Sequence, residues 1–404
     1  MVGIGGYARL YVERLLQGDL PEVRIAAVVD PAAASTPHWP ELERAGVPKF
    51  DTLADFLASG IDVDLAVVST PIALHTEHTC ALLSVGIHVL CEKPMAATLE
   101  DARKMQTARD ASGTFLEIGY QWSFSDAVRS LKADILADTF GAPKRLATRV
   151  AWPRTRWYYS RNAWAGCKHD PRGRPVFDSP ANNATAHYLH NMLFLLGPSM
   201  TEAVMPTAIT AECYRANPIE NFDAVCCRIE TREGPELLFF SAHCVDIHSD
   251  PVCRFEFEEA VVTMKDSLEF VAHFRDGREI RYGDPNEHHM RKLEVCIDHV
   301  RLGGAVKAYC GPEAAMAQVQ CIGAMQEVPI LDFEPSQIRQ KVWEDSEMLT
   351  YVPGLADAMR SGFEQGRLFS ELDLPWAGPA KRVVLPGAYS DAGLSTLTKR
   401  TEGC

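Results

Sequence analysis

The sequence predicts an α/β protein that begins with a doubly wound parallel sheet and continues with an α/β domain built on an open, mainly antiparallel sheet. Up to residue 120, short apolar runs alternate with helical patterns, which is typical of βαβ units. Between residues 208 and 282, alternating runs follow one another without helices, which favours antiparallel strands. The length of 404 residues exceeds one core of usual size. We therefore expect domains over residues 1–120 and 121–350, and a C-terminal extension over 351–404 that packs on the surface.

The chain opens on a glycine turn, Gly3-Ile-Gly5-Gly6-Tyr7-Ala8, before an amphipathic run at 9–16. Backbone N–H groups and the positive end of such a helix would meet a pyrophosphate. The next strand, at 23–30, ends in Asp30, where the ribose hydroxyls of a dinucleotide would lie. Only Met1 and Val2 precede the turn, so either the first strand is unusually short or the natural start lies upstream of Met1.

The rest of the first domain continues the alternation of strands and helices. We expect helices at 53–57, 77–85 and 99–112, and strands at 63–69, 87–91 and 115–119. The strand at 87–91 stops at Glu92-Lys93-Pro94, because a charged pair and a proline follow its apolar run. Ligands of open α/β sheets bind at the carboxyl ends of the strands, so Lys93 is placed to meet one. The alternative is a surface lysine after a strand.

The second domain is expected to start with a helix at 126–137 and a strand at 145–151. A helix at 183–196 ends at Gly197-Pro198, a clear stop signal. The alternating runs lie at 208–214, 223–230, 236–244, 253–257, 260–264, 268–275 and 278–282. Helices at 290–301, 312–325 and 343–351 close the chain, and the sequence from residue 366 onward is loop-like apart from an apolar patch at 383–385.

Composition excludes several classes of protein. Forty basic residues against 54 acidic ones give a net charge of −14, which repels phosphate backbones and anionic membranes, so no nucleic-acid or membrane partner is expected. The 12 cysteines are scattered without a C-x-x-C motif, which indicates reduced thiols in a cytoplasmic protein. We find no apolar run of membrane-spanning length and no secretion leader.

The predicted helix at 183–196 carries a candidate site. Asn183 and His187 are four residues apart and would share one helix face, with His190 beside them. The apolar side of this helix is expected to be buried, so His187 would face the seam with the first domain. The alternatives are a packed histidine and a metal-binding pair with His190. Because no third ligand is obvious, we expect no metal.

The loop from residue 152 to residue 164 is rich in aromatic rings and arginines. Sugar C–H faces stack on aromatic rings, and sugar hydroxyls accept hydrogen bonds from Arg and Asn. The same residue types are common at subunit interfaces, so the two alternatives stay open. The candidate substrate contacts in this loop are Trp152, Arg154, Tyr158, Tyr159, Arg161, Asn162 and Trp164.

Together these motifs resemble the Gfo/Idh/MocA oxidoreductase family, the relatives of glucose–fructose oxidoreductase and inositol dehydrogenases. The resemblance covers roughly residues 1–340 and rests on Gly3-x-Gly5-Gly6-x-Ala8, Asp30-Pro31, Ser69-Thr70-Pro71 with His75, Glu92-Lys93-Pro94 and Leu195-Leu196-Gly197. It implies a Rossmann domain, a second α/β domain, a tightly held nicotinamide dinucleotide and a sugar or polyol substrate. It also implies that Lys93 and His187 flank the reacting carbon.

The resemblance further implies a set of binding residues. Those for the cofactor are Gly3, Gly5, Gly6, Tyr7, Ala8, Asp30, Thr70, Pro71, His75, Glu92, Lys93 and Gln121. Those for the substrate are Lys93, Asn183, His187 and His190, besides the aromatic loop. Typical members read D-x-x-x-H-x-x-D on the helix, whereas Asn183 and His190 stand at the two acid positions here.

We therefore expect an NAD-dependent dehydrogenase of a sugar, polyol or glycoside, acting as a homodimer or homotetramer. Lys93 would supply the cation and a proton relay, and His187, with an ordinary pKa of about 6.5, would be the base. NAD is expected over NADP, because Asp30 repels a 2′-phosphate and no Arg or Lys occurs in 31–37. The alternatives are glycoside cleavage through transient oxidation and elimination, and a non-catalytic dinucleotide-binding sensor.

Overall fold

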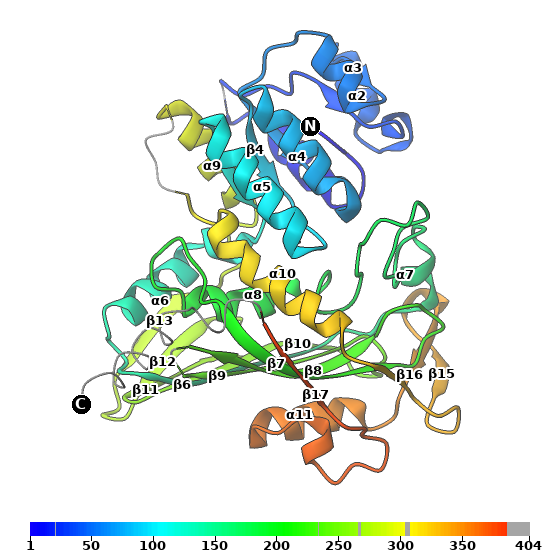
Figure 1. The fold of residues 1–404 in the computed structure, drawn as a ribbon. Coiled ribbons are helices and arrows are strands. Elements are labelled where there is room, and N and C mark those ends of the chain that lie inside the picture. The colour runs from blue at the N-terminus through cyan, green and yellow to red at the C-terminus, as the bar shows by residue number, and fades with distance from the viewer. Residues whose placement is uncertain (21, 233, 266–267, 304–307, 386–404) are drawn as a thin grey trace, which may run out of the picture.

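The computed structural model describes residues 1–20, 22–232, 234–265, 268–303 and 308–385. In Figure 1 the N-terminal domain lies above a large sheet, with helices between the domain and the sheet and also beneath the sheet. The expected α/β fold with a parallel and a mainly antiparallel sheet is confirmed.

The N-terminal domain has the doubly wound topology of a Rossmann fold. Its parallel strands are β1 (Val28–Val29), β2 (Lys49–Phe50), β3 (Leu65–Val68), β4 (His88–Cys91) and β5 (Leu116–Ile118). Its helices are α1 (Arg9–Leu16), α2 (Trp39–Arg44), α3 (Leu53–Ala58), α4 (His75–Ser84) and α5 (Leu99–Ser112), with 3₁₀ turns η1 (Gly6–Ala8), η2 (Ala33–Ser35) and η3 (Ile72–Leu74). Val2 forms parallel bridges with Val29 and Val68, so the order across the domain is β2-β1-Val2-β3-β4-β5.

Local sequence signals set both ends of helix α5. The hydroxyl of Thr98 accepts a hydrogen bond from the Asp101 N–H at 3.1 Å and caps the start of α5. Gly113 follows the last turn with φ +71°, a left-handed conformation that favours glycine. Strand β4 is also predictable, because Val89, Leu90 and Cys91 are fully buried in the middle of the parallel sheet.

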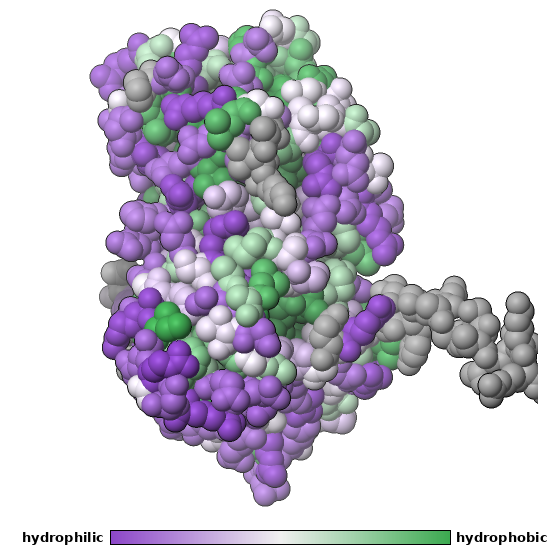
Figure 2. Space-filling view, turned by 90° about the vertical axis from the view of Figure 1, so that its left-hand side faces the viewer, coloured by the Kyte–Doolittle hydropathy of each residue, from purple (hydrophilic) through white to green (hydrophobic). Residues whose placement is uncertain are grey.

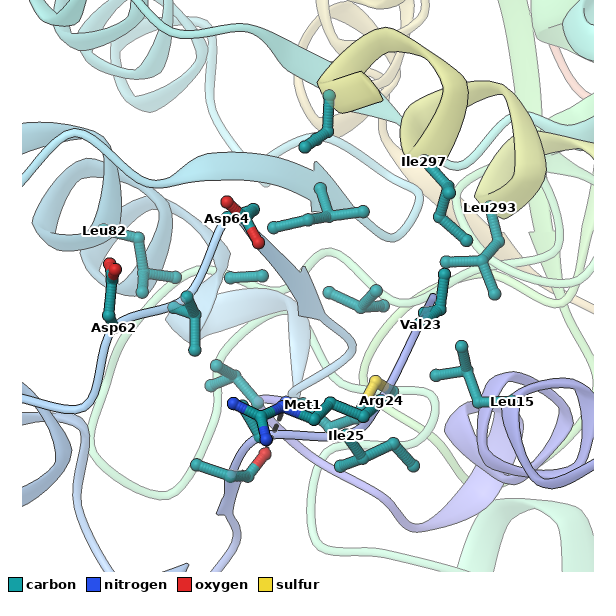
Figure 3. Close-up of a pocket in the computed structure, with 18 of the residues that line it drawn as sticks. Met1, Leu15, Val23, Arg24, Ile25, Asp62, Asp64, Leu82, Leu293 and Ile297 are labelled. Atoms are coloured by element: carbon teal, nitrogen blue, oxygen red, sulfur yellow. Dashed lines mark hydrogen bonds between the residues drawn. The ribbon is translucent and has the colours of Figure 1, made fainter. Parts of the chain in front are cut away.

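The amino-terminal edge of this sheet contains a cavity of about 320 Å³. The ladders of β1 and β3 begin only at Val28 and Leu65, so the expected strands at 23–30 and 63–69 are both shorter than predicted. Figure 3 shows Val23, Ile25 and Asp64 around the cavity, together with residues of α9. The buried amine of Met1 donates to the Ala27 carbonyl at 2.8 Å, and burial lowers its pKa to about 5. This cavity lies at the opposite edge of the sheet from Lys93, which follows β4.

The second sheet has ten strands and is mixed but mainly antiparallel. In spatial order its main path runs β13 (Glu279–Gly283), β12 (Phe270–Phe274), β11 (Ala260–Met264), β10 (Ser249–Phe257), β6 (Pro143–Ala151), β9 (Glu236–Ala242), β8 (Ala224–Thr231), β7 (Pro206–Arg215) and β14 (Ile330–Asp332). The pairs β6–β9 and β7–β14 are parallel. The C-terminal strand β17 (Lys381–Val384) joins the edge at β7.

Helices cover both faces of this sheet. The helices of the described chain after residue 120 are α6 (Asp126–Leu136), α7 (Arg156–Ser160), α8 (Ala186–Leu195), α9 (Arg291–Arg301), α10 (Pro312–Gln326) and α11 (Leu355–Gln365), with 3₁₀ turns η4 (Gln121–Phe124), η5 (Glu344–Ser346) and η6 (Phe369–Glu371). In Figure 1, α8 and α10 lie between the sheet and the Rossmann domain, and α11 lies on the outer face. Helix α9 instead packs on β3 and β4, so it completes the Rossmann domain from a distant part of the sequence.

The C-terminal part differs from its prediction in three ways. The expected helix at 343–351 is wrong: β15 (Arg339–Val342) and β16 (Met348–Tyr351) form a hairpin there. Helix α11 was not predicted. The loop-like segment after residue 366 contributes β17 to the sheet, and residues 386–404 of the expected extension lie outside the described residues.

The outer face of the central strands is a second apolar core. Ala147, Leu238 and Phe240 of the sheet pack with Leu355 and Met359 of α11. This face is therefore covered by the chain's own C-terminal region. Figure 2 shows another side of the molecule, where hydrophilic residues dominate the periphery and hydrophobic residues gather near the middle. Within the described ranges, no helix has the length and apolar character needed to cross a membrane.

Candidate active site

The glycine turn forms a cradle that side chains would fill. Gly3 has φ +83°, and a Cβ there would lie 2.7 Å from the Ser69 carbonyl oxygen. Gly5 precedes η1 and Gly6 is its first residue; both are exposed, and a Cβ on Gly6 would meet nothing within 4 Å. Backbone N–H groups at this helix start therefore face an open site, as pyrophosphate binding requires. Ala8 is buried below the turn.

Asp30 is held at the end of β1 beside this cradle. Its two carboxylate oxygens accept hydrogen bonds from the Ile4 N–H at 2.9 Å and the Ala32 N–H at 2.8 Å. The side chain stays partly exposed, so the carboxylate has free lone pairs toward solvent. The residues at this edge thus fit a dinucleotide, with Asp30 in reach of a ribose.

Two of the expected cofactor contacts are turned inward. His75 is only 1% exposed, and its ring nitrogens lie 2.9 Å from the Pro94 carbonyl oxygen and 2.8 Å from that of Thr70. The His75 side chain therefore ties two loops together and is not available to a cofactor, which corrects the sequence-based expectation. The Glu92 carboxylate also points into the interior and accepts the Tyr11 hydroxyl at 2.5 Å. Its expected contact with a cofactor is likewise wrong for the side chain.

The other expected cofactor residues lie at the open edge. Pro71 is exposed and Thr70 is partly exposed after β3. The Tyr7 hydroxyl donates to the Gln121 side-chain oxygen at 3.2 Å and lies 2.6 Å from the His289 ring. Tyr7 and Gln121 thus connect the glycine turn with the start of the second domain.

A buried ion pair joins β4 to α9. Lys292, whose side chain has no exposed surface, donates to Glu92 and also to the Gly119 carbonyl at 3.3 Å. Burial opposes ionisation of Glu92, but the Lys292 ammonium and the Tyr11 hydroxyl outweigh it, so the pKa of Glu92 is lowered. A Cβ on Gly119 would lie 2.7 Å from the Glu92 carboxylate, so glycine is required there. The pair fixes the end of β4.

Lys93, the next residue, points the other way, across to the second domain. Its ammonium donates to the Asn183 carbonyl at 2.8 Å and lies 3.4 Å from the Asn183 side-chain oxygen. Burial lowers the pKa of Lys93 to about 8, although the Glu92 and Asp178 carboxylates act against this shift. Lys93 is therefore a cation at neutral pH that loses its proton only about one unit higher.

Asn183 reaches Lys93 from a turn and not from a helix face. Helix α8 begins at Ala186, so the prediction that Asn183 and His187 share a helical face is wrong. The Asn183 N–H donates to the Ser179 carbonyl at 3.0 Å, and the Thr185 hydroxyl donates to that of Pro180 at 2.8 Å. These turn contacts place the Asn183 amide over the end of β4.

His187 lies in the first turn of α8 and is partly exposed. Its Nδ1 is buried and has no hydrogen-bond partner among the described residues. Burial, and then the nearby Lys93 ammonium, lower the pKa of His187 well below 6.5. The expectation of an ordinary histidine pKa is therefore wrong. The imidazole is neutral at physiological pH, as a proton acceptor must be.

His190 is not a substrate contact, contrary to the sequence-based expectation. It has no exposed surface, its Nε2 lies 2.9 Å from the Ser123 hydroxyl, and its ring stacks on Tyr120 with centroids 3.8 Å apart. Burial lowers the pKa of His190 to about 3, so it is a neutral core side chain. Residues three apart are neighbours on a helix surface, and Tyr120 contacts both histidine rings, but the contacts with Ser123 and Tyr120 bury His190.

The aromatic loop divides into anchoring residues and residues nearer the site. Trp152 packs edge-on against Tyr188, and the Asn162 side-chain oxygen accepts the Trp164 N–H at 3.0 Å, so both stabilise the loop. The Arg161 guanidinium lies 3.6 Å above the Tyr158 ring. Five of the candidate residues contact other parts of the loop or the second sheet. They are Trp152, Arg154, Tyr159, Asn162 and Trp164.

The positive charge of Arg161 acts to lower the pKa of both Lys93 and Asp178. Arg161 and Tyr158 are therefore the loop residues that the structure connects to the Lys93 region, and substrate contact by the loop stays a prediction.

Sequence reasoning missed three residues of this region: Lys292, Tyr120 and Asp178. Lys292 lies one helical turn before Cys296 on the apolar face of α9. A lysine on an apolar helix face indicates a buried partner of opposite charge, so the sequence could have pointed to this residue. Asp178 precedes the Ser-Pro of a turn, a pattern too common to single out. Within the part of the chain that the structure describes, no group of three or more His, Cys, Asp or Glu side chains is arranged to hold a metal ion.

Comparisons with known proteins agree with this geometry. Residues 1–120 match the Gfo/Idh/MocA model, an oxidoreductase family with an NAD-binding Rossmann fold. The rhizopine catabolism protein MocA of Rhizobium meliloti is 33% identical over 141 residues, 35% of this chain and 43% of that protein. The 1,5-anhydro-D-fructose reductase of Ensifer adhaerens is 40% identical over 105 residues, 26% of this chain and 31% of that one. The match thus spans less than half of either relative.

The fold of most of the chain also has solved counterparts. The WlbA dehydrogenase from Bordetella pertussis, in complex with NADH and UDP-GlcNAcA, superposes with a TM-score of 0.64 at 20% identity, over 81% of this chain and 94% of that one. The shared feature is a fold that combines an N-terminal Rossmann domain with a second α/β domain. The match of residues 1–120 to the Gfo/Idh/MocA model confirms the resemblance of the motifs in the N-terminal domain.

Proposed function

We propose that this protein is an NAD-dependent dehydrogenase of a secondary alcohol in a sugar, polyol or glycoside. The observation that carries the proposal is the meeting of Lys93, from the carboxyl end of the Rossmann sheet, with the turn that leads into the helix of His187. A protonated lysine and a neutral histidine near the open edge of a dinucleotide fold are the two groups that alcohol oxidation needs.

The cofactor side of the proposal rests on the glycine cradle and Asp30. Gly5, Gly6 and the start of α1 would hold the pyrophosphate, and Asp30 would accept hydrogen bonds from the ribose hydroxyls. A bound nicotinamide ring supplies the acceptor for the hydride. The carboxylate of Asp30 and the lack of Arg or Lys in 31–37 favour NAD over NADP.

On the substrate side, the neutral imidazole of His187 accepts the hydroxyl proton as the C–H hydride leaves. The Lys93 ammonium stabilises the negative charge that develops on the oxygen, and it can pass a proton to it in the reverse direction. Asn183 holds Lys93 in position through its carbonyl. The relatives include proteins named for sugar substrates, which supports a carbohydrate or polyol here.

The test is to incubate the purified protein with NAD+ or NADP+ and a panel of sugars, inositols and glycosides, after checking for co-purified cofactor. Stoichiometric NADH formation with at least one compound supports the dehydrogenase. Release of a leaving group without net NADH would instead identify glycoside cleavage. Tight dinucleotide binding without turnover of any compound would point to a sensor and contradict the proposal.

A cytoplasmic location and a homodimer or homotetramer stay predictions. Because α11 covers the outer face of β6, β8 and β9, an oligomer would use another surface. Light scattering on the purified protein gives its mass in solution and tests this expectation.

A further inference from the structure

We propose that Asp178 is the positioning carboxylate of this site, acting on Lys93 through the Asn183 side chain in place of the acid that is absent from the helix. The inference rests on the proposed function, because it assigns a role in the same proton-transfer step. Asp178 lies in the segment before α8, not on the helix itself.

The contacts form an unbroken chain from carboxylate to ammonium. The Asn183 side-chain NH₂ donates to Asp178 Oδ1 at 2.7 Å, while the Asn183 side-chain oxygen lies 3.4 Å from the Lys93 ammonium. An amide can donate at one end and accept at the other, so Asn183 links the two charged groups. Asn183 thus couples Lys93 to a carboxylate that does not touch it.

Asp178 is itself rigidly held. Only 2% of it is exposed, and its second carboxylate oxygen accepts the Gly166 N–H at 2.6 Å. Burial raises the pKa of Asp178, while the Gly166 N–H and the Arg161 and Lys93 charges act against that shift. Each of its two oxygens thus accepts one hydrogen bond, which fixes the orientation of the carboxylate.

The charge of Asp178 matters because little other negative charge offsets the Lys93 ammonium. The Glu92 carboxylate favours the ammonium form of Lys93 but is itself paired with Lys292, and the Lys292 and Arg161 cations disfavour it. His187, which also interacts electrostatically with Lys93, is neutral and adds no charge at neutral pH. Asp178 is therefore the second carboxylate that keeps Lys93 protonated.

A purely structural role is the rival explanation, since Asp178 also caps the Gly166 N–H. The two roles differ in what they do to Lys93. A structural carboxylate changes stability without changing the proton affinity of Lys93. A positioning carboxylate sets that affinity, so removing its charge lowers the pKa of Lys93 from about 8.

The experiment compares wild type with Asp178→Asn, Asn183→Leu and the double variant Asp178→Asn/Asn183→Asp. The first removes the charge, the second breaks the link, and the third moves the carboxylate to the neighbouring position. The proton affinity of Lys93 is measured without substrate or cofactor, from the pH dependence of acetylation by acetic anhydride, read by mass spectrometry of the peptide that contains residue 93. The basic limb of kcat/KM is measured in parallel.

We expect both single variants to lower the labelling midpoint of Lys93 and the basic limb of kcat/KM by about one unit, equivalent to about tenfold in kcat/KM above the limb. The double variant should move both back toward wild type. An unchanged midpoint in a folded Asp178→Asn protein would overturn the proposal, and so would a double variant that stays at the Asp178→Asn midpoint. If Asp178→Asn does not fold, Asn183→Leu decides by the same criterion. A shifted midpoint in a protein that reduces no dinucleotide would instead contradict the proposed function alone.

Discussion

Glu92 and Lys93 are adjacent residues at the end of β4, yet their side chains belong to two different regions. Glu92 turns into the Rossmann core, where Lys292 and the Tyr11 hydroxyl bind it directly. Lys93 crosses to the second domain, where it meets the polar oxygens of Asn183 and has no direct carboxylate partner among the described residues. One strand end thus supplies both a fixed ion pair and a weakly neutralised cation.

The difference teaches how a buried lysine becomes reactive. Lys292 is matched by a carboxylate in contact, and such a pair holds its geometry and its charges. Lys93 is matched only through an intervening amide, so burial brings its pKa down to about 8. A lysine that titrates near physiological pH can both stabilise charge and exchange a proton. We expect the first region to control stability and the second to control turnover.

The largest effect is expected for a substitution of His187, which tests whether the Lys93 region controls turnover. His187→Asn removes the proposed base, a neutral imidazole that interacts electrostatically with Lys93, so kcat should fall by about 10²–10⁴. The matched control is His190→Asn, three residues along the same helix and turned into the core. Equal losses per folded molecule in both variants would contradict the assignment.

The pH profile of the wild type tests the two proton affinities together. In the proposed mechanism, the active form has a neutral His187 and a protonated Lys93. Since the pKa of His187 is well below 6.5, kcat/KM should stay flat through pH 6.5, and it should fall about tenfold per unit above the Lys93 pKa of about 8. A limb centred on an ordinary histidine value would refute the structural account of His187.

The Glu92 region can be disturbed without touching a charged group. Gly119→Ala places a Cβ against the Glu92 carboxylate, so it should cost about 1–3 kcal/mol of unfolding free energy through overpacking. Urea denaturation measures this cost. The control is Gly323→Ala in α10, where a Cβ meets nothing within 4 Å. A Gly119→Ala protein as stable as that control would mean that the pair is not tightly packed.

The smallest effect is expected at the cofactor end. Asp30→Ala should narrow the preference for NAD over NADP by about tenfold, equivalent to about 1.4 kcal/mol, because it removes the repulsion of a 2′-phosphate. Dissociation constants of the two dinucleotides give the ratio directly. A wild type that binds NADP as tightly as NAD would contradict the role given to Asp30.

The parts of this structure that could be predicted are those with local causes. The buried apolar run of β4 and the capped helix α5 have their signals within a few residues of sequence. The helix predicted at 343–351 is instead part of a hairpin, because short amphipathic runs fit both periods and the positive φ of Ser346, +62°, has no signal in the sequence. The turn at Asn183 could not be predicted either. The hydrogen bond from the Thr185 hydroxyl to the Pro180 carbonyl lies just before α8, which begins at Ala186, and this contact has no local sequence signal.

The site itself depends on contacts that no local pattern carries. Glu92 and Lys292 are 200 residues apart, and their pairing appears only when α9 returns to the Rossmann sheet. The side chains of His75 and His190 were expected at the site for their chemistry, but their surroundings turned them inward. Residue type predicted the kind of chemistry, and tertiary contacts decided which side chains are free to do it.

The central claim, that neighbouring Glu92 and Lys93 divide stability from turnover, is tested most directly by measuring Lys93→Met and Lys292→Met side by side for rate and for unfolding free energy. Lys93→Met should lose turnover by about 10²–10³ while its stability changes little. Lys292→Met leaves the Glu92 carboxylate buried and unpaired, so it should lose about 3–5 kcal/mol of stability. Its remaining folded molecules should still turn over. The opposite pattern, with Lys93→Met unstable but active per folded molecule, would contradict the account.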